Sequence, residues 1–171
     1  MKISTLITFL SLSLLTALSC SKFRPDQKDT TRYYLVRHAE KVVDGTDDPD
    51  LSREGQQRAQ KLASVMKDKK IERLYATDFK RTQQTLQPLA KSLNLQIDTY
   101  DAHDPAAVTR MLADCKGKNV VIAGHSNTIP GLANKLIGEE KYKNLEDDDY
   151  SKMWEIVLTG DRVTGEKVIT Y

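Results

Sequence analysis

Apolar and polar positions after residue 30 follow two different periods in turn. Short apolar runs are typical of strands, and apolar residues three and four positions apart are typical of helices. The short runs predict strands over residues 31–36, 71–76, 95–100, 119–123, 153–158 and 167–171, and the longer period predicts helices over residues 53–67, 79–93, 105–115 and 130–137. This alternation predicts an α/β protein, a three-layer α/β/α sandwich around a mostly parallel central sheet.

Individual residues indicate how these elements begin, end and pair. Ser52 can cap the first predicted helix, and Asp104 followed by Pro105 is typical of a helix start. Pro88 should kink the second helix or end its first half. The run at 119–123 (NVVIA) is the most apolar and is therefore placed at the centre of the sheet. The last two strands flank the sequence TGDRVTGE and should close as an antiparallel hairpin.

The amino terminus has the layout of an export signal. Lys2 precedes an uncharged apolar run, residues 3–19, that ends in small residues. The sequence LTALSC, which ends at Cys20, resembles the lipobox of bacterial lipoproteins, in which the cysteine becomes the first residue and carries acyl chains. An uncleaved membrane anchor over residues 3–19 is the alternative.

Three segments follow from this interpretation. They are a signal peptide over residues 1–19, a tether over residues 20–30 that starts at the lipid-modified cysteine, and a folded domain over residues 31–171. The resemblance implies an exported bacterial lipoprotein that faces the periplasm and is held on a membrane by its acyl chains.

Composition and charge narrow the class of protein. The chain has 171 residues, of which 39% are apolar and 29% charged, which is enough for one domain with a core. Its net charge of +2 would fall to +1 once Lys2 leaves with the signal, and nothing indicates a nucleic-acid surface. Cys115 stands at helical spacing with Val108, Met111 and Leu112, which predicts a buried structural thiol and not a nucleophile.

Polar residues follow four of the predicted strands directly. Arg37 and His38 follow the first strand, residues 77–81 (TDFKR) the second, residues 101–104 (DAHD) the third, and residues 124–127 (GHSN) the central one. Ligands of such sheets bind beyond the carboxyl ends of the strands. Two of the three histidines, two arginines and several carboxylates are therefore predicted to meet in one site.

These side-chain types suit phosphoryl transfer. Guanidinium groups offer forked donors that match phosphate oxygens. A neutral imidazole can attack phosphorus, while a second imidazole and the arginines hold the charge on the equatorial oxygens. A carboxylic acid can then protonate the leaving oxygen. The chemistry requires no metal or other cofactor, and the expected partner is a small phosphorylated substrate.

Four motifs, in order, resemble those of the histidine phosphatase superfamily, which is also called the phosphoglycerate mutase-like family. They are RHAEK at 37–41, LSREGQQRA at 51–59, YATDFKRTQQT at 75–85 and GHSNTIP at 124–130. The resemblance implies a phosphoglycerate mutase-like fold. It implies that His38 is the nucleophile that becomes phosphorylated, and that Arg37, Arg81 and His125 complete the phosphate pocket.

The general acid does not follow from the motifs. Enzymes of the family that the motifs resemble usually carry a glutamate after the third strand, where this chain has Asp101 and Asp104. Because Asp104 already serves as a predicted helix cap, Asp101 is the choice for the acid. His103, between them, is expected to be a solvated loop residue.

Three further residues have two interpretations each. Glu40 is placed at the pocket mouth, where it would contact substrate or pair with Lys41. Asn127 would contact phosphate or cap the following helix. Tyr150 would pack as a core residue beside Trp154 under the edge of the site, or take part in it.

The function predicted from these residues is a metal-independent phosphatase that hydrolyses phosphomonoesters, or phosphohistidine, through phosphorylated His38. One alternative is a noncatalytic phosphate- or phosphoprotein-binding module of the same fold, and another is a phosphomutase. A third interpretation makes His38, His103 and His125 ligands of a catalytic zinc ion.

Overall fold

The computed structural model describes residues 30–171, so the predicted signal peptide, Cys20 and nearly all of the tether lie outside the described residues. The strands within this range are β1 (Thr30–Arg37), β2 (Arg73–Ala76), β3 (Ile97–Thr99), β4 (Asn119–Gly124), β5 (Lys152–Thr159) and β6 (Arg162–Thr170). The helices are α1 (Arg53–Met66), α2 (Lys80–Leu93), α3 (Pro105–Asp114) and α4 (Thr128–Ile137). None of these helices has the length and apolar character needed to cross a membrane.

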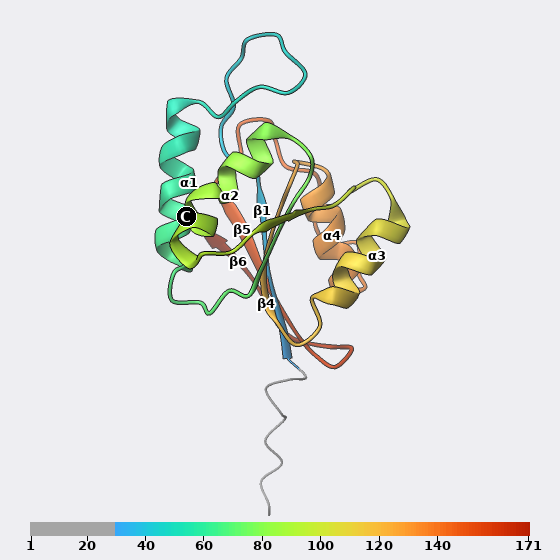
Figure 1. Cartoon of the computed structure of the whole chain (residues 1–171). Coiled ribbons are helices and arrows are strands. Elements are labelled where there is room, and N and C mark those ends of the chain that lie inside the picture. The colour runs from blue at the N-terminus through green and yellow to red at the C-terminus, as the bar shows by residue number, and fades with distance from the viewer. Residues whose placement is uncertain (1–29) are drawn as a thin grey trace, which may run out of the picture.

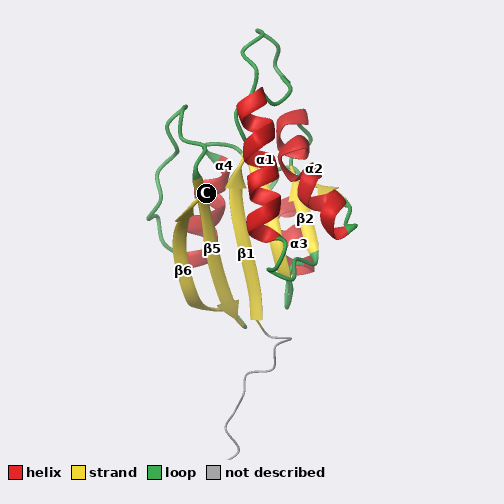
Figure 2. Cartoon of the chain, turned by 90° about the vertical axis from the view of Figure 1, so that its left-hand side faces the viewer, coloured by secondary structure: helices red, strands yellow, loops and turns green. Residues whose placement is uncertain are grey.

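The six strands form one sheet in the order β3-β2-β4-β1-β5-β6. The pairs β3/β2, β2/β4 and β4/β1 are parallel, whereas β1/β5 and β5/β6 are antiparallel. The predicted α/β/α sandwich with a mostly parallel sheet is thereby confirmed, and the apolar strand β4 lies between two parallel neighbours, as predicted. Figure 1 shows the helices on both sides of the sheet, and Figure 2 shows β6 at its edge.

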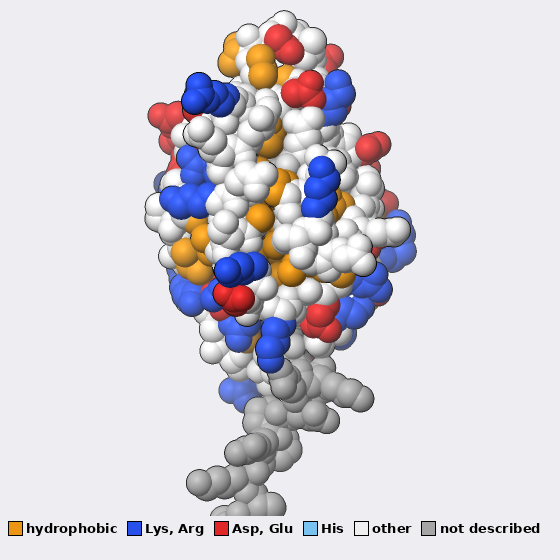
Figure 3. All heavy atoms as spheres, turned by 60° about the vertical axis from the view of Figure 1, so that its left-hand side comes forward, with side chains coloured by type: hydrophobic (Ala, Val, Ile, Leu, Met, Phe, Trp, Pro, Cys, Tyr) orange, Lys and Arg blue, Asp and Glu red, His pale blue; other side chains and the backbone are white. Residues whose placement is uncertain are grey.

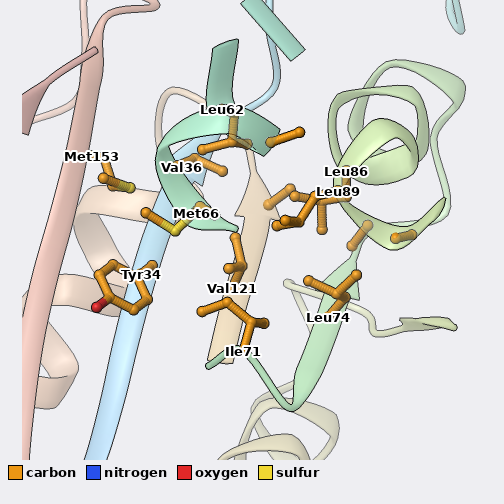
Figure 4. Packing of buried hydrophobic residues seen from close by; sticks show 14 of the residues in the cluster. Tyr34, Val36, Leu62, Met66, Ile71, Leu74, Leu86, Leu89, Val121 and Met153 are labelled. Carbon is orange, nitrogen blue, oxygen red and sulfur yellow. The ribbon is translucent and has the colours of Figure 1, made fainter. Parts of the chain in front are cut away.

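Alternate residues of β1 point to opposite faces of the sheet and enter two cores. Tyr34 and Val36 pack with Leu62 and Met66 of α1 and with α2 (Figure 4). Tyr33 and Leu35 belong to the second core, which α3 and α4 cover. That second core also holds Cys115, a fully buried free thiol whose pKa burial raises to about 12, as expected of a structural cysteine.

The surface over α1 and α2 carries charges of both signs. In Figure 3, Lys and Arg side chains are interspersed with Asp and Glu, and apolar side chains show between them. This mixture agrees with the nearly balanced composition of the chain.

The structure decides two local predictions. Pro88 does not end the first half of α2, because the helix continues past it to Leu93, and the alternative, a kink at Pro88, stays a prediction. The predicted long turn TGDRVTGE is a tight turn at Gly160, whose φ of +58° suits glycine, and β6 already begins at Arg162. The first half of β6 is mostly exposed and lacks an apolar alternation, so its pairing with β5, rather than its own side chains, makes it a strand.

Candidate active site

The parallel register brings the predicted site residues to one edge of the sheet. Arg37 at the end of β1 pairs with Gly124 at the end of β4, and Ala76 at the end of β2 pairs with Ala123. The residues that follow these pairs therefore emerge side by side at the carboxyl ends of the strands. His38 continues this register, because its backbone N–H donates to the carbonyl oxygen of Gly124 at 2.9 Å.

His38 is buried and held as one tautomer. Its Nδ1 lies 2.8 Å from the carbonyl oxygen of Ala39, and a carbonyl oxygen only accepts, so Nδ1 carries the proton and Nε2 keeps a lone pair. Burial, together with the charges of Arg37, His125 and Arg81, lowers the pKa of His38 to about 3. The ring is therefore neutral at physiological pH, and Nε2 is a candidate nucleophile.

The segment after His38 is fixed by α1 and α2. The backbone N–H of Ala39 donates to Thr85 Oγ1 of α2 at 2.9 Å, and Thr85 is fully buried. The carbonyl oxygen of Glu40 accepts from the N–H of Ser52, the residue that caps α1 through its side chain, as predicted. These bonds hold the backbone on which the imidazole stands.

Arg37 lies against Tyr150 and a loop that is distant in sequence. Its Nη1 donates to the carbonyl oxygens of Glu146 and Asp149 at 2.8 and 3.1 Å, and its guanidinium carbon lies 4.1 Å from the centre of the Tyr150 ring. The same ring is 5.9 Å from that of His38. Tyr150 is thus a site residue.

The expected packing of Tyr150 beside Trp154 is wrong, because Tyr142 takes that place. The rings of Tyr142 and Trp154 meet edge to face at 5.5 Å. The two tyrosines stand on the same polar loop, and the sequence alone does not show which of them contacts Trp154.

Arg81 and His125 are linked by Phe79. The guanidinium carbon of Arg81 lies 4.3 Å from the centre of the Phe79 ring, and that ring meets His125 edge to face at 5.0 Å. Arg81 is also oriented from the loop before α1, where it donates to the carbonyl oxygen of Asp47 and lies 3.6 Å from Oδ1 of Asp48.

The two histidines that the motifs indicate are neighbours. The rings of His38 and His125 are 5.5 Å apart and inclined at 65°. Burial, with the charges of Arg81, His103 and Arg37, lowers the pKa of His125 to about 4. A continuous series of contacts therefore joins all four predicted pocket residues, in the order Arg37, Tyr150, His38, His125, Phe79 and Arg81.

Two pockets lie beside this series of contacting residues. One, of about 420 Å³, is lined by His125 and by residues that follow β2 and β3, including Phe79, Asp101 and His103. The other, of about 440 Å³, is lined by Arg37 and Tyr150 together with Lys41, Val43, Asp147 and Asp148. The strand ends thus offer space beside His125 and beside Arg37.

The two candidate acids differ in their surroundings. Asp104 caps α3, because its Oδ1 accepts from the N–H of Ala106 at 2.8 Å, and it also lies 3.6 Å from Arg110. Asp101 is exposed and lines the same pocket as His125, with its Oδ1 accepting from the N–H of His103 at 2.8 Å. The helix cap predicted for Asp104 is confirmed, and Asp101 is the one of the two that faces the site.

Glu40 has a partner that the sequence did not suggest. It pairs with Arg58 of α1, whose Nη2 and Nε lie 2.7 and 2.9 Å from its carboxylate, and not with Lys41. Arg58 also donates to the carbonyl oxygen of Tyr171 at 2.9 Å. Glu40 thus joins the segment after His38 to α1 and to residue 171.

Asn127 is exposed at the start of α4 and makes no capping hydrogen bond with its side chain, contrary to its predicted capping role. Thr128 instead accepts from the N–H of His125 at 2.9 Å. Within residues 30–171, no three His, Cys, Asp or Glu side chains gather closely enough to hold a metal ion, so His38, His103 and His125 do not form the alternative zinc site.

Similar folds occur among solved structures. One described as the protein histidine phosphatase SixA complexed with tungstate has a TM-score of 0.64 at 20% identity, over 81% of this chain and 96% of that one. A putative alpha-ribazole-5'-P phosphatase from Escherichia coli K-12 has a TM-score of 0.66 at 14% identity, over 82% of this chain and 96% of that one. A mycobacterial glucosyl-3-phosphoglycerate phosphatase in complex with inorganic phosphate has a TM-score of 0.61 at 12% identity, over 82% of this chain and 96% of that one. At such identities the likeness is one of fold.

The fold and the paired histidines define an α/β sandwich protein with a cationic, imidazole-bearing site at its strand ends. The family model described as "Histidine phosphatase superfamily (branch 1)" matches residues 33–103, which include Arg37, His38 and Arg81. A search of curated proteins by sequence finds no match. Over residues 33–103 the chain thus resembles the histidine phosphatase superfamily, and its fold is that of solved structures described as phosphatases.

Proposed function

We propose that the chain is a metal-independent phosphatase that hydrolyses phosphomonoesters, or phosphohistidine, through a phosphoryl group carried on Nε2 of His38. The observation that carries the proposal is the state of this imidazole, which is buried and neutral, with Nδ1–H bound to the carbonyl oxygen of Ala39. The similarity to structures described as phosphatases agrees with it.

In the first step, Nε2 attacks phosphorus as the bond from phosphorus to the leaving atom breaks, which is oxygen in a phosphomonoester and nitrogen in phosphohistidine. The imidazole gains positive charge, and the Nδ1–H bond to Ala39 becomes stronger as it does so. Arg37 and Arg81, each held against an aromatic ring, both lie near enough to lower the pKa of His38, and they neutralise the charge on the phosphoryl oxygens.

Asp101 is the proposed general acid. Its protonated carboxyl gives a proton to the leaving oxygen or nitrogen, and its carboxylate then takes a proton from the water that attacks phosphorus. The bond between nitrogen and phosphorus breaks in this second step, which releases phosphate and restores neutral His38. The position of Asp101 in the pocket beside His125 favours it over Asp104, which is held at the start of α3.

A steady-state assay with p-nitrophenyl phosphate between pH 4 and 8 tests the proposal. Wild type should be faster than His38→Ala at every pH and should keep its rate in EDTA. Equal rates for the two proteins would instead favour a noncatalytic phosphate-binding module. Once turnover is established, a panel of sugar phosphates, nucleotides, phytate and phosphopeptides, with His38→Ala as the blank, would define the substrate.

We also propose that the chain is exported and anchored through acyl chains on Cys20, with its site facing the periplasm. The proposal rests on the sequence of residues 1–20. Labelling with radioactive palmitate should mark the wild-type chain and not Cys20→Ala. Equal labelling of both would refute the anchor and would leave the enzymatic proposal untouched.

A further inference from the structure

His125 is held at Nε2 by a buried hydroxyl group to which no motif gave a role. Nε2 lies 2.9 Å from Thr77 Oγ1, which in turn lies 3.1 Å from Thr82 Oγ1. Thr77 is 4% exposed and Thr82 is 0% exposed, so both hydroxyls depend on protein groups for their hydrogen bonds. Each hydroxyl has a single proton to donate, and the far end of the series therefore sets its direction.

Two backbone carbonyls fix that far end. Thr82 Oγ1 lies 2.8 Å from the carbonyl oxygens of both Thr77 and Phe79, and these oxygens only accept. The proton of Thr82 is therefore directed to them, and the oxygen of Thr82 is left to accept from the hydroxyl of Thr77. The oxygen of Thr77 then accepts from Nε2–H of His125.

The opposite direction makes one hydrogen bond fewer. If Thr77 donated to Nε2, the two hydroxyl oxygens would face each other at 3.1 Å with no proton between them. A bond left unmade between buried polar groups is costly, because no water replaces it. The arrangement with Nε2–H satisfies all three members of the series.

We infer that Thr77 is a positioning residue for the site: supported by Thr82, it holds neutral His125 as the Nε2–H tautomer and leaves Nδ1 for a phosphoryl oxygen. Within residues 30–171, Nε2 is the only ring nitrogen of His125 with a hydrogen-bond partner. His38 has the opposite arrangement, with its proton on Nδ1. The two neighbouring imidazoles are thus opposite tautomers.

The tautomer has a consequence for binding, and this step rests on the proposed function. A lone pair on Nδ1 repels the oxygens of a phosphate dianion, so His125 must gain a proton at Nδ1 when the dianion binds. The lowered pKa of the free protein reflects burial and the charge of the two arginines, and a bound anion offsets that charge. Phosphate binding should therefore be coupled to proton uptake by His125.

Long-range proton–nitrogen correlation spectra of the full chain, labelled with ¹⁵N-histidine, test the inference directly. The chain has three histidines, and a His103→Gln sample identifies the third. At neutral pH the expected spectrum shows His125 as the Nε2–H tautomer and His38 as the Nδ1–H tautomer. Adding inorganic phosphate should convert His125 to its doubly protonated form. An Nδ1–H tautomer for His125 in the free protein would overturn the inference.

Two substitutions separate positioning from general stability. Thr77→Val removes the hydroxyl at similar volume, and it should mix the His125 tautomers and lower kcat/KM for p-nitrophenyl phosphate about tenfold, as the loss of one buried hydrogen bond implies. Thr77→Ser keeps the oxygen and should remain within about twofold of wild type. Thr109→Val, at an exposed position of α3, is the matched control and should change neither property.

Thr77→Val with an unchanged tautomer and unchanged turnover would also overturn the inference. If Thr77→Val does not fold, the wild-type spectrum and Thr77→Ser still decide it. Absence of turnover in wild type would instead contradict the proposed function. The tautomer of His125 in the free protein could still be measured in that case.

Discussion

The carbonyl oxygen of Glu40 occupies the space that a β-carbon at position 55 would need. Gly55 lies in the first turn of α1, and a β-carbon there would overlap this oxygen and stand 3.0 Å from the carbonyl carbon. The close approach lets Ser52 N–H reach Glu40 and fixes the backbone two residues after His38. The absence of a side chain at position 55 is therefore part of how His38 is placed.

Gly55→Ala should destabilise the protein by about 1–3 kcal/mol, because the backbone around Glu40 or the start of α1 must move. Urea unfolding measures the change. Gly131→Ala is the matched control, since Gly131 also lies in a helix and a β-carbon there meets nothing within 4 Å. The control should be more stable than wild type by about 0.5–1 kcal/mol. Equal effects at the two positions would contradict this account of Gly55.

Acid should destabilise the fold through the two histidines of the site, His38 and His125. Folding lowers the pKa of His38 to about 3 and that of His125 to about 4, from an ordinary value of 6.5. Between these values the unfolded chain binds more protons than the native one, so the stability these groups contribute is present above pH 6.5 and is lost as the pH falls. Each histidine contributes a slope of up to about 1.4 kcal/mol per pH unit.

Unfolding in urea at several pH values between 4 and 7 measures that slope. The His38→Gln variant should lose the share that belongs to His38 and therefore depend less steeply on pH than wild type. If the free energy of unfolding depends equally steeply on pH in the two proteins, His38 is not kept neutral in the native state.

The aromatic ring of Tyr150, and not its hydroxyl group, should contribute to the binding of phosphate. The guanidinium of Arg37 lies 4.1 Å from the ring centre, and such a contact is worth about 1 kcal/mol, or about fivefold in affinity. Tyr150→Ala should weaken competitive inhibition by inorganic phosphate by about that factor, whereas Tyr150→Phe should leave it nearly unchanged. A loss of the same size in both variants would assign the effect to the hydroxyl group.

Substitutions of Asp101 and Asp104 should change different properties of the protein: the rate of hydrolysis for Asp101 and the free energy of unfolding for Asp104. Asp101→Asn should slow hydrolysis of an alkyl phosphate about a hundredfold, while p-nitrophenyl phosphate, whose leaving group needs little help from an acid, should be affected far less. Asp104→Ala should lower the free energy of unfolding by about 1 kcal/mol through the lost helix cap and leave the ratio of the two rates unchanged. The reverse pattern would make Asp104 the acid.

The parts of this site that sequence predicts are those that depend on local pattern and strand direction. Val120 to Ala123 are fully buried in β4, as their unbroken apolar run requires. Because β1, β2 and β4 are parallel, the residues after them meet at one edge, and His38 and His125 become neighbours although they are distant in sequence. The caps at Ser52 and Asp104 act within one turn and were equally predictable, whereas the cap predicted for Asn127 was wrong.

The parts that sequence does not predict are polar contacts between distant segments. Arg37 donates to backbone carbonyls of a loop more than a hundred residues away, and any loop residue has such a carbonyl. Glu40 had a cationic neighbour in Lys41, yet the helix packing sets Arg58 against it. Thr77 resembles an ordinary residue at a strand end until His125 is placed beside its hydroxyl.

The most direct test of the central claim is mass spectrometry of the chain quenched in alkali during turnover, since alkali preserves phosphohistidine. The account predicts a phosphoryl group on the peptide that contains His38, present with substrate and absent from His38→Ala. Rapid hydrolysis of substrate with no phosphoryl group on that peptide, at any time before substrate is exhausted, would contradict it.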